Sequence, residues 1–160
     1  MCHPPAAALF ETGSSRMPQT RTVLVIDDDP NIREVLQLVL EDHGFRVIGA
    51  PDGEVGIDKA LKDKPHLIIV DMMMPKVSGF IVLERLKHQH KLTTPIIMLT
   101  GNESDHQRAY AEFLGADLYL TKPIRPYQLF EAIARFLPVG FAPHSYATAA
   151  TVQEPVGQRY

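Results

Sequence analysis

Short apolar runs alternate with amphipathic stretches through the middle of the chain, between residues 21 and 138. This alternation predicts repeated strand-helix units in which a parallel sheet is covered by helices on both faces. The runs predicted to be strands are 22–26, 45–48, 66–70, 95–99 and 117–120. The first, third and fourth runs are apolar almost throughout, which is typical of central strands, whereas the other two alternate and indicate outer strands.

The stretches between the runs carry helix start and stop signals. Asp29 and Pro30 supply an N-cap and a first-turn proline. Apolar residues then recur on one face of the predicted helix, and Gly44 ends it. The predicted helices are 30–43, 53–62, 79–88, 104–114 and 126–136. Gly56 lies inside the second helix and weakens its propensity. The pattern therefore predicts a doubly wound α/β domain with five parallel strands and five helices.

The two ends of the chain lack this pattern. Residues 1–20 and 139–160 are rich in Ala, Pro, Ser, Thr and Gln and show neither the period of a strand nor that of a helix. We therefore expect a disordered N-terminal extension over 1–20, one folded domain over 21–138 and a disordered C-terminal tail over 139–160. Because each end is short, we expect neither to form a separate output domain.

Composition and charge narrow the class of protein. The 160 residues, 45% of them hydrophobic, suffice for one ordinary core. Lys and Arg number 16 against 19 Asp and Glu, so the net charge is -3, and neither nucleic acid nor a membrane surface is expected as a direct partner. Cys2 is the single cysteine, so no internal disulfide forms, and no apolar stretch approaches a membrane span or a signal peptide. These features predict a cytoplasmic protein.

Polar side chains follow four of the predicted strands. Asp27 and Asp28 come after the first run, Asp71 after the third, Thr100 after the fourth and Lys122 after the fifth. Open parallel sheets hold ligands at the carboxyl ends of their strands, so these side chains are expected to share one site. Carboxylates about 4 Å apart repel each other by ~4 kcal/mol per pair at an effective dielectric of 20, and Mg²⁺ would relieve that repulsion.

The same residue types fit phosphoryl chemistry. An aspartate carboxylate can attack phosphorus and form an acyl phosphate, provided that nearby cations neutralise the approaching negative charges. Asp71 is the candidate nucleophile, Lys122 supplies a positive charge, and Thr100 supplies a hydroxyl donor for the phosphoryl oxygens.

Four fragments, in this order and each at the end of an apolar run, resemble the receiver domain of response regulators in bacterial-type two-component signalling. They are 23–30 (VLVIDDDP), 68–75 (IIVDMMMP) with Gly79, 98–101 (MLTG) and 119–123 (YLTKP). The resemblance covers 21–138 and implies a flavodoxin-like fold with strand order 2-1-3-4-5. It also implies a stand-alone phosphorelay switch, not an enzyme, whose chemistry is limited to accepting and slowly losing its own phosphoryl group.

The resemblance assigns roles to individual residues. Asp71 would become a 4-aspartylphosphate, taking its phosphoryl group from a sensor histidine kinase or a histidine phosphotransfer protein. Mg²⁺ would be held by Asp28 directly, by Asp27 mostly through water, by Asp71, and by the backbone carbonyl of Met73. Lys122 would pair with the phosphoryl group.

The resemblance also implies a switch. Thr100 would follow the phosphoryl group while Tyr119 changes rotamer behind it, and the Lys122–Pro123 peptide is expected to be cis. The surface formed by the last strand and the last two helices would then change its affinity for an unknown downstream protein, and it allows a homodimer.

Further positions are implied to tune or receive the phosphoryl group. Met73 and Asn102 lie two residues beyond Asp71 and Thr100, where side chains set how fast the acyl phosphate hydrolyses. Because a bulky thioether at residue 73 orients water poorly, we expect a long-lived phosphoryl state. Docking points for the donor are expected at Ile32, Leu36 and Pro123, although Leu36 also fits the core.

Two other functions remain open at this point. A Mg²⁺-dependent phosphohydrolase of the haloacid-dehalogenase type would use Asp27 of an Asp-x-Asp pair as its nucleophile, with Thr100 and Lys122 at later strand ends. That family also needs an acidic pair beyond the lysine, and the pattern leaves Asp71 unexplained. The other alternative is an interaction module that works without phosphate. Asp29, the second acid of the Asp-x-Asp pair, is predicted to be a helix cap.

Overall fold

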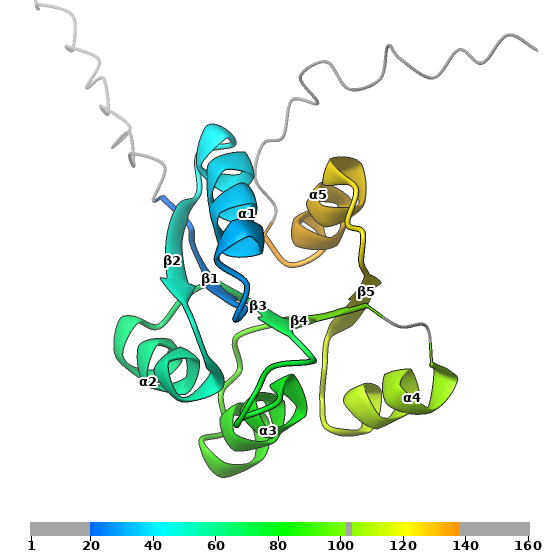
Figure 1. Cartoon of the computed structure of the whole chain (residues 1–160). Helices are drawn as coiled ribbons and strands as arrows, with labels where there is room; N and C mark the ends of the chain where they lie inside the picture. The colour runs from blue at the N-terminus through cyan, green and yellow to red at the C-terminus, as the bar shows by residue number, and fades with distance from the viewer. Residues whose placement is uncertain (1–19, 102–103, 138–160) are drawn as a thin grey trace, which may run out of the picture.

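The computed structural model describes residues 20–101 and 104–137 and shows a five-stranded parallel sheet (Figure 1). The strands are β1 (Thr22–Ile26), β2 (Arg46–Ala50), β3 (Leu67–Asp71), β4 (Ile96–Thr100) and β5 (Leu118–Thr121). They lie in the order β2-β1-β3-β4-β5. The predicted flavodoxin-like fold class is confirmed. Apart from residue 20, the predicted extension 1–20 and tail 139–160 lie outside the described residues.

Helices cover both faces of the sheet, as the alternation of apolar runs predicts. They are α1 (Pro30–Asp42), α2 (Gly53–Asp63), α3 (Gly79–Glu84) with the π-helical turn η1 (Arg85–Gln89), α4 (Asp105–Phe113) and α5 (Pro126–Ala134). In Figure 1, α1 and α5 lie on one side of the sheet, and α2, α3 and α4 lie on the other. None of the helices that the structure describes is long and apolar enough to span a membrane.

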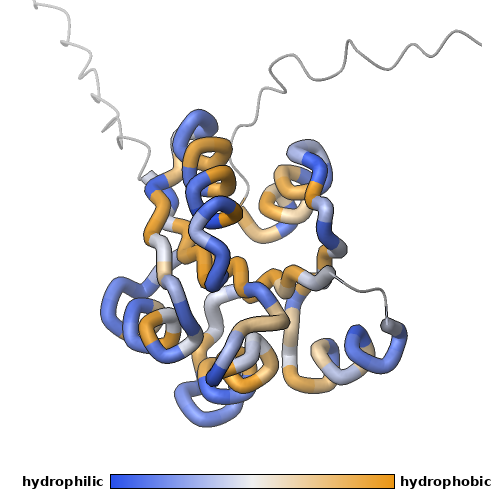
Figure 2. The backbone as a smooth tube through the Cα atoms, viewed as in Figure 1, coloured by the Kyte–Doolittle hydropathy of each residue, from blue (hydrophilic) through white to orange (hydrophobic). Residues whose placement is uncertain are grey.

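The side chains of β1 show how the two faces are filled. Leu24 and Ile26 belong to the core beneath α2, α3 and α4, whereas Val23 and Val25 belong to the core beneath α1 and α5. Successive strand residues point to opposite faces, so a continuous apolar run feeds both cores. The apolar positions of the chain accordingly face inward from both layers of helices (Figure 2). The outer strands β2 and β5 are only partly buried, as predicted.

The third helix differs from its prediction. The sequence predicts one helix over 79–88, but the chain widens after Glu84 into the π-helical turn, where the N–H of His90 donates to the Arg85 carbonyl at 2.9 Å. The wider turn keeps Leu86 fully buried while Lys87 forms an ion pair with Asp117 at 2.8 Å. Tertiary contacts thus decide the winding of this segment.

Most strands begin and end later than predicted, and at the ends of β3, β4 and β5 the added residue is polar and continues the ladder. Asp71 pairs with Leu99, and Thr100 pairs with Thr121. The run that starts at Pro95 enters the sheet only at its second residue, since proline has no N–H to donate. Two candidate site residues, Asp71 and Thr100, are therefore the last residues of strands and not the first residues of loops.

Gly56 has a packing role that its low helix propensity conceals. A Cβ at this position would lie 2.5–2.9 Å from three side-chain carbons of Ile26, closer than real contacts allow. The missing side chain lets α2 approach β1 directly, and Gly56 is buried there. The sequence penalty inside the helix is therefore offset by close helix-sheet packing.

Lys64 offers a test of the local backbone. It ends α2 in the left-handed conformation, with φ of 46°, which a Cβ disfavours. We expect Lys64→Gly to raise the free energy of unfolding by about 1 kcal/mol in denaturant titrations. The matched control is Lys62→Gly, on the exposed last turn of α2, which is expected to lower it by about 1 kcal/mol. Shifts of the same sign in both variants would contradict this account.

Candidate functional site

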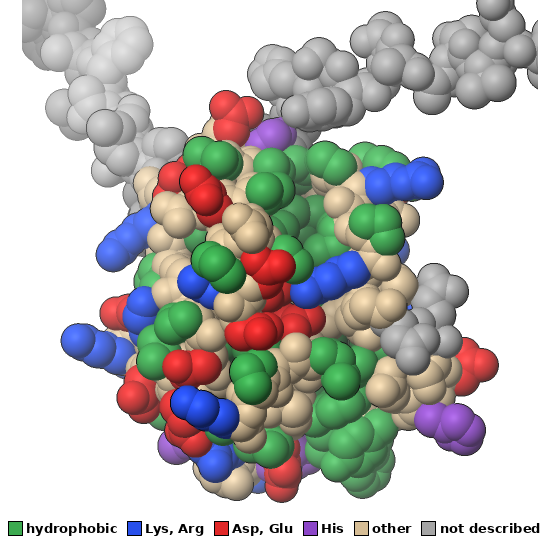
Figure 3. Space-filling view, in the orientation of Figure 1, with side chains coloured by type: hydrophobic (Ala, Val, Ile, Leu, Met, Phe, Trp, Pro, Cys, Tyr) green, Lys and Arg blue, Asp and Glu red, His purple; other side chains and the backbone are tan. Residues whose placement is uncertain are grey.

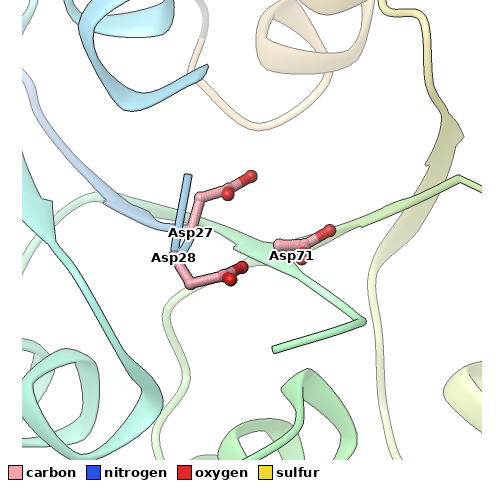
Figure 4. Close-up of side chains that lie close together, drawn as sticks. All are labelled: Asp27, Asp28 and Asp71. Carbon is pink, nitrogen blue, oxygen red and sulfur yellow. The ribbon is translucent and has the colours of Figure 1, made fainter. Parts of the chain in front are cut away.

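Three aspartates meet where the strand order reverses. Asp27 and Asp28 directly follow β1, and Asp71 ends the neighbouring strand β3 (Figure 4). One carboxylate oxygen from each can be chosen so that the three atoms lie within 4.8 Å of one another. Open parallel sheets bind ligands at this reversal point, because the loops from β1 and β3 separate to opposite faces there. Acidic side chains gather in the middle of the corresponding surface, with Lys or Arg side chains beside them (Figure 3).

Asp27 is buried and held at each of its polar groups. Its N–H donates to the Ala50 carbonyl at 3.2 Å, and its own carbonyl accepts from Arg33 Nη1 at 2.6 Å. One carboxylate oxygen, Oδ1, accepts from the Asp29 N–H at 2.9 Å, and Oδ2 accepts from Lys122 Nζ at 2.9 Å. Asp27 is therefore a fixed anchor of the site.

Lys122 joins the two strands through its ammonium group. Nζ lies 2.9 Å from Asp27 Oδ2 and 2.9 Å from Asp71 Oδ1. Burial alone would lower the pKa of Lys122, but the hydrogen bonds and charges of Asp71 and Asp27 hold the pKa above its usual value of 10.5. The lysine is thus a permanent cation at the centre of the site.

Asp71 is buried at the end of β3, and its surroundings disfavour its charge. Loss of hydrating water raises the pKa of Asp71 above its usual value of 3.8, and the negative charges of Asp27 and Asp28 raise it further. The hydrogen bond and positive charge of Lys122 oppose this rise without cancelling it. Asp71 therefore carries its negative charge at a cost in stability.

The donor set fits a hard divalent cation. Every candidate ligand is an oxygen, and three carboxylates with one nearby lysine leave excess negative charge. Asp28 is exposed, and within 20–101 and 104–137 its carboxylate has no hydrogen-bond partner, so it is available to a ligand from solvent. Carboxylates with room for water are the preferred surroundings of Mg²⁺.

Thr100 and Tyr119 occupy neighbouring strands beside this cluster. Thr100, at the end of β4, is fully buried and pairs with Thr121 of β5, and Tyr119 lies two residues before Thr121 on the same strand. The Tyr119 hydroxyl lies 4.0 Å from Met72 Sδ, and Arg108 of α4 lies over the ring, 5.9 Å from its centroid. The tyrosine therefore contacts both the residue after Asp71 and the first turns of α4.

Three other residues that the sequence analysis singled out differ in their surroundings. Met73 lies two residues beyond Asp71 in the β3–α3 loop and is 67% exposed, whereas Met72 and Met74 on either side of it are buried. Asp29 caps α1 by accepting from the Asn31 N–H at 2.9 Å, as predicted, and takes no part in the carboxylate cluster. Asn102 lies outside the described residues.

The Lys122–Pro123 peptide is cis, as predicted. Pro123 borders an apolar groove of about 580 Å³ between α1 and the loop that leads from β5 to α5. The groove is lined by Asn31, Ile32, Val35, Leu36, Gly101, Lys122, Pro123 and Ile124. It thus contains the three predicted docking residues and reaches Lys122 of the acidic site.

Two contacts of the site have no counterpart in the sequence prediction. Arg33 binds the Asp27 carbonyl, and Met72 contacts Tyr119. Arg33 lies six residues beyond Asp27, in a predicted helix where an arginine is expected to be exposed to solvent. Met72 belongs to a run of three methionines, which is expected only to pack within a loop. Only the folded arrangement reveals either contact.

Comparison with known proteins agrees with the fold. The sequence model described as the response regulator receiver domain matches residues 23–134. The chain is 43% identical over 106 residues to the alkaline phosphatase synthesis transcriptional regulatory protein PhoP of Bacillus subtilis, across 66% of this chain and 44% of that protein. It is 41% identical over 115 residues to the transcriptional regulatory protein CpxR of Escherichia coli, across 72% of this chain and 48% of CpxR. It spans about half the length of these curated relatives.

A solved structure also has a similar fold. The chemotaxis response regulator CheY4 of Vibrio cholerae superimposes with a TM-score of 0.70 and 34% sequence identity. The match covers 74% of this chain and 99% of that one.

Proposed function

Because this chain belongs to the family of response regulator receiver domains, we propose that Asp71 accepts a phosphoryl group and thereby switches the affinity of the domain for a partner. Receiver domains serve phosphorylation-dependent two-component signalling and form a family of signalling proteins, not of catalytic enzymes. The observation that carries the proposal is the setting of Asp71, which is buried, paired with Lys122 at 2.9 Å and flanked by Asp27 and Asp28.

The donor would be the phosphohistidine of a histidine kinase or of a histidine phosphotransfer protein. An Asp71 carboxylate oxygen bonds to phosphorus as the bond between phosphorus and the imidazole nitrogen breaks, so the phosphoryl group passes from one side chain to the other. Lys122 and Thr100 hold the phosphoryl oxygens. Mg²⁺ would be held by Asp28, Asp71 and the Met73 carbonyl, and by Asp27 mostly through water. When bound, its charge would offset the repulsion between the phosphoryl group and the carboxylates.

The groove beside α1 is the proposed docking site for the donor. Ile32, Leu36 and Pro123 line it, and Lys122 reaches from its edge to the acidic cluster. Leu36 is also buried in the core beneath α1 and α5, so it serves both as packing and as groove wall. Apolar docking next to Asp71 would hold the donor histidine near its acceptor.

The output surface is proposed to be the face of α4, β5 and α5. Tyr119 lies on β5 and contacts Met72 next to Asp71 as well as Arg108 on α4. Phosphorylation would shift Thr100 and Tyr119 between two existing arrangements, and partner affinity would change only as far as the partner distinguishes them. The partner is a downstream protein or a second copy of the chain, in the cytoplasm. The absence of direct nucleic-acid contact remains a prediction from net charge.

A small phosphodonor with Mg²⁺ tests the proposal. Acetyl phosphate or phosphoramidate is added to the full chain, and the modified residue is mapped by mass spectrometry after borohydride trapping. Label on Asp71 is expected. Label on Asp27 would favour the phosphohydrolase, although Asp27 has both carboxylate oxygens occupied and its Asp-x-Asp partner, Asp29, caps α1. No label, combined with partner binding that Asp71→Asn leaves unchanged, would favour the phosphate-independent module.

Met73 provides a prediction about the lifetime of the phosphoryl group. Its exposed thioether neither donates nor strongly accepts hydrogen bonds, so it does not orient water toward the acyl phosphate. We expect the acyl phosphate to persist well beyond seconds at neutral pH with Mg²⁺. Met73→Asn, which places an amide at the same site, is expected to speed hydrolysis about tenfold, equivalent to about 1.4 kcal/mol of barrier. The decay of radiolabelled protein measures both, with Met73→Leu as the control; equal rates in the Asn and Leu variants would contradict the prediction.

A further inference from the structure

Arg33 of α1 donates from Nη1 to the Asp27 carbonyl oxygen at 2.6 Å. We propose that Arg33 is a positioning residue, which holds the peptide between Asp27 and Asp28 so that the Asp28 carboxylate faces the metal site. This inference rests on the proposed function, because it concerns the Mg²⁺ that the three aspartates would hold.

The hydrogen bonds of Asp27 place Arg33 in this role. A peptide unit is planar, so a hydrogen bond that fixes the Asp27 carbonyl also fixes the direction in which the Asp28 N–H and Cα continue. The N–H of Asp27 is already fixed by Ala50, and its carboxylate by Lys122 and the Asp29 N–H. Arg33 therefore secures the remaining polar group of Asp27, the one that belongs to the peptide leading into Asp28.

Asp28 depends on that peptide more than its neighbours do. It is exposed, and in the part of the chain that the structure describes its carboxylate makes no hydrogen bond or ion pair. By contrast, Asp27 and Asp71 are both buried and paired with Lys122. A metal ligand held only through its backbone loses orientation when that backbone is released, which is how residues behind a ligand tune metal affinity.

The neighbouring strand leaves space for the arginine. A Cβ built on Gly49 of β2 would meet the Arg33 Cδ at 3.9 Å, an ordinary contact, and it would meet nothing closer. The stem of Arg33 therefore passes next to a strand residue that has no side chain. Lys59 of α2 donates to the Gly49 carbonyl at 2.6 Å, which fixes this part of β2.

The two possible roles of Arg33, positioning Asp28 or supplying a positive charge, predict opposite changes in Mg²⁺ affinity when Arg33 is removed. If Arg33 acted only as a positive charge near the carboxylates, its removal would strengthen the binding of a cation by lifting electrostatic repulsion. If Arg33 positions Asp28, its removal weakens the binding, although the net charge of the site has become more favourable. The sign of the change therefore separates the two roles.

The test is a calorimetric Mg²⁺ titration of the full chain without any phosphodonor. Arg33→Met keeps the length of the stem and removes the guanidinium, and we expect it to raise the Mg²⁺ dissociation constant about tenfold or more. Arg33→Lys, which keeps a donor, is expected to recover part of the loss. The matched control is Arg46→Met, an exposed arginine on β2, which should leave the dissociation constant unchanged.

A second pair of variants perturbs Arg33 without replacing it. Gly49→Val adds branched carbons that crowd the Arg33 stem, and it should also weaken Mg²⁺ binding, whereas Gly49→Ala adds only the Cβ for which there is room. This pair keeps the test valid if Arg33→Met does not fold. Thermal melts in saturating Mg²⁺ verify that each variant is folded before its affinity is compared.

The outcomes separate this inference from the function on which it rests. Weaker Mg²⁺ binding in Arg33→Met and Gly49→Val, but not in Arg46→Met and Gly49→Ala, supports the positioning role. Unchanged or tighter binding in Arg33→Met overturns it and leaves the proposed function standing. A wild-type chain that binds no Mg²⁺, and whose Asp71 takes no label from a phosphodonor, overturns both.

Discussion

Asp71→Asn is expected to abolish phosphoryl uptake completely while making the fold more stable at neutral pH. The amide cannot form the acyl phosphate, so incubation with a phosphodonor and Mg²⁺ should add no mass to the variant. The amide is also uncharged, and it keeps an oxygen that can accept from Lys122. Phosphoryl uptake by the variant would show that Asp71 is not the acceptor.

The stability gain should depend on pH in a defined direction. The pKa of Asp71 is raised, mainly by burial and further by Asp27 and Asp28, against the opposing effect of Lys122. An acid with a raised pKa in the folded protein binds its proton more tightly there, so the fold loses stability as the pH rises from 3.8 through the folded pKa. The asparagine variant escapes this loss. Its advantage is therefore absent below pH 3.8 and complete above the folded pKa.

Urea titrations at several pH values measure this difference. We expect a gain of about 1 kcal/mol at pH 7, corresponding to a rise of about 4 °C in Tm, and little difference in the most acidic samples that remain folded. The control is Asp58→Asn, an exposed position on α2, where no such dependence is expected. A gain that is equal at all pH values would show that the charge of Asp71 is not its cause.

The sequence predicts the sheet well because its signals are local. The predicted runs at 22–26 and 66–70 are apolar almost throughout, and a helix cap at Asp29 follows the first of them. Strands, helices and their order along the chain can therefore be predicted from neighbouring residues. Asp71 and Thr100 are also found this way, because a polar residue at the end of an apolar run is conspicuous. Their exact pairing in the sheet cannot be predicted in this way, because it depends on the cross-strand partners.

The parts that escape prediction depend on contacts between distant segments. The π-helical turn after Glu84 accommodates buried Leu86 and the ion pair of Lys87 with Asp117, thirty residues further along the chain. The bond from Arg33 to the Asp27 carbonyl involves the backbone, which has the same chemistry at every residue and leaves no mark in the sequence. Candidate ligands can thus be predicted from residue types, whereas the groups that orient them require the fold.

Gly79 shows how tightly the backbone is packed behind Asp71. Gly79 is buried at the start of α3, and its N–H donates to the Met72 carbonyl at 3.0 Å. A Cβ at this position would overlap the Asp71 carbonyl oxygen and lie 2.9 Å from the Met72 Cα. These are backbone atoms, so no side-chain rotation can relieve the overlap. Either α3 or the end of β3 must move.

Gly79→Ala is therefore expected to lower the free energy of unfolding by about 2–3 kcal/mol and Tm by about 10 °C, measured by urea titration and thermal melting. The matched control is Gly101→Ala, where an added Cβ has no atom within 4 Å and stability should change by less than about 0.5 kcal/mol. The folded fraction of Gly79→Ala should also accept phosphate more slowly than wild type, because the displaced backbone carries the Asp71 carboxylate away from Lys122. Loss of stability at a wild-type rate would mean that α3 yields and the end of β3 does not. Stability equal to that of the control would contradict the close approach of Gly79 to Asp71 itself.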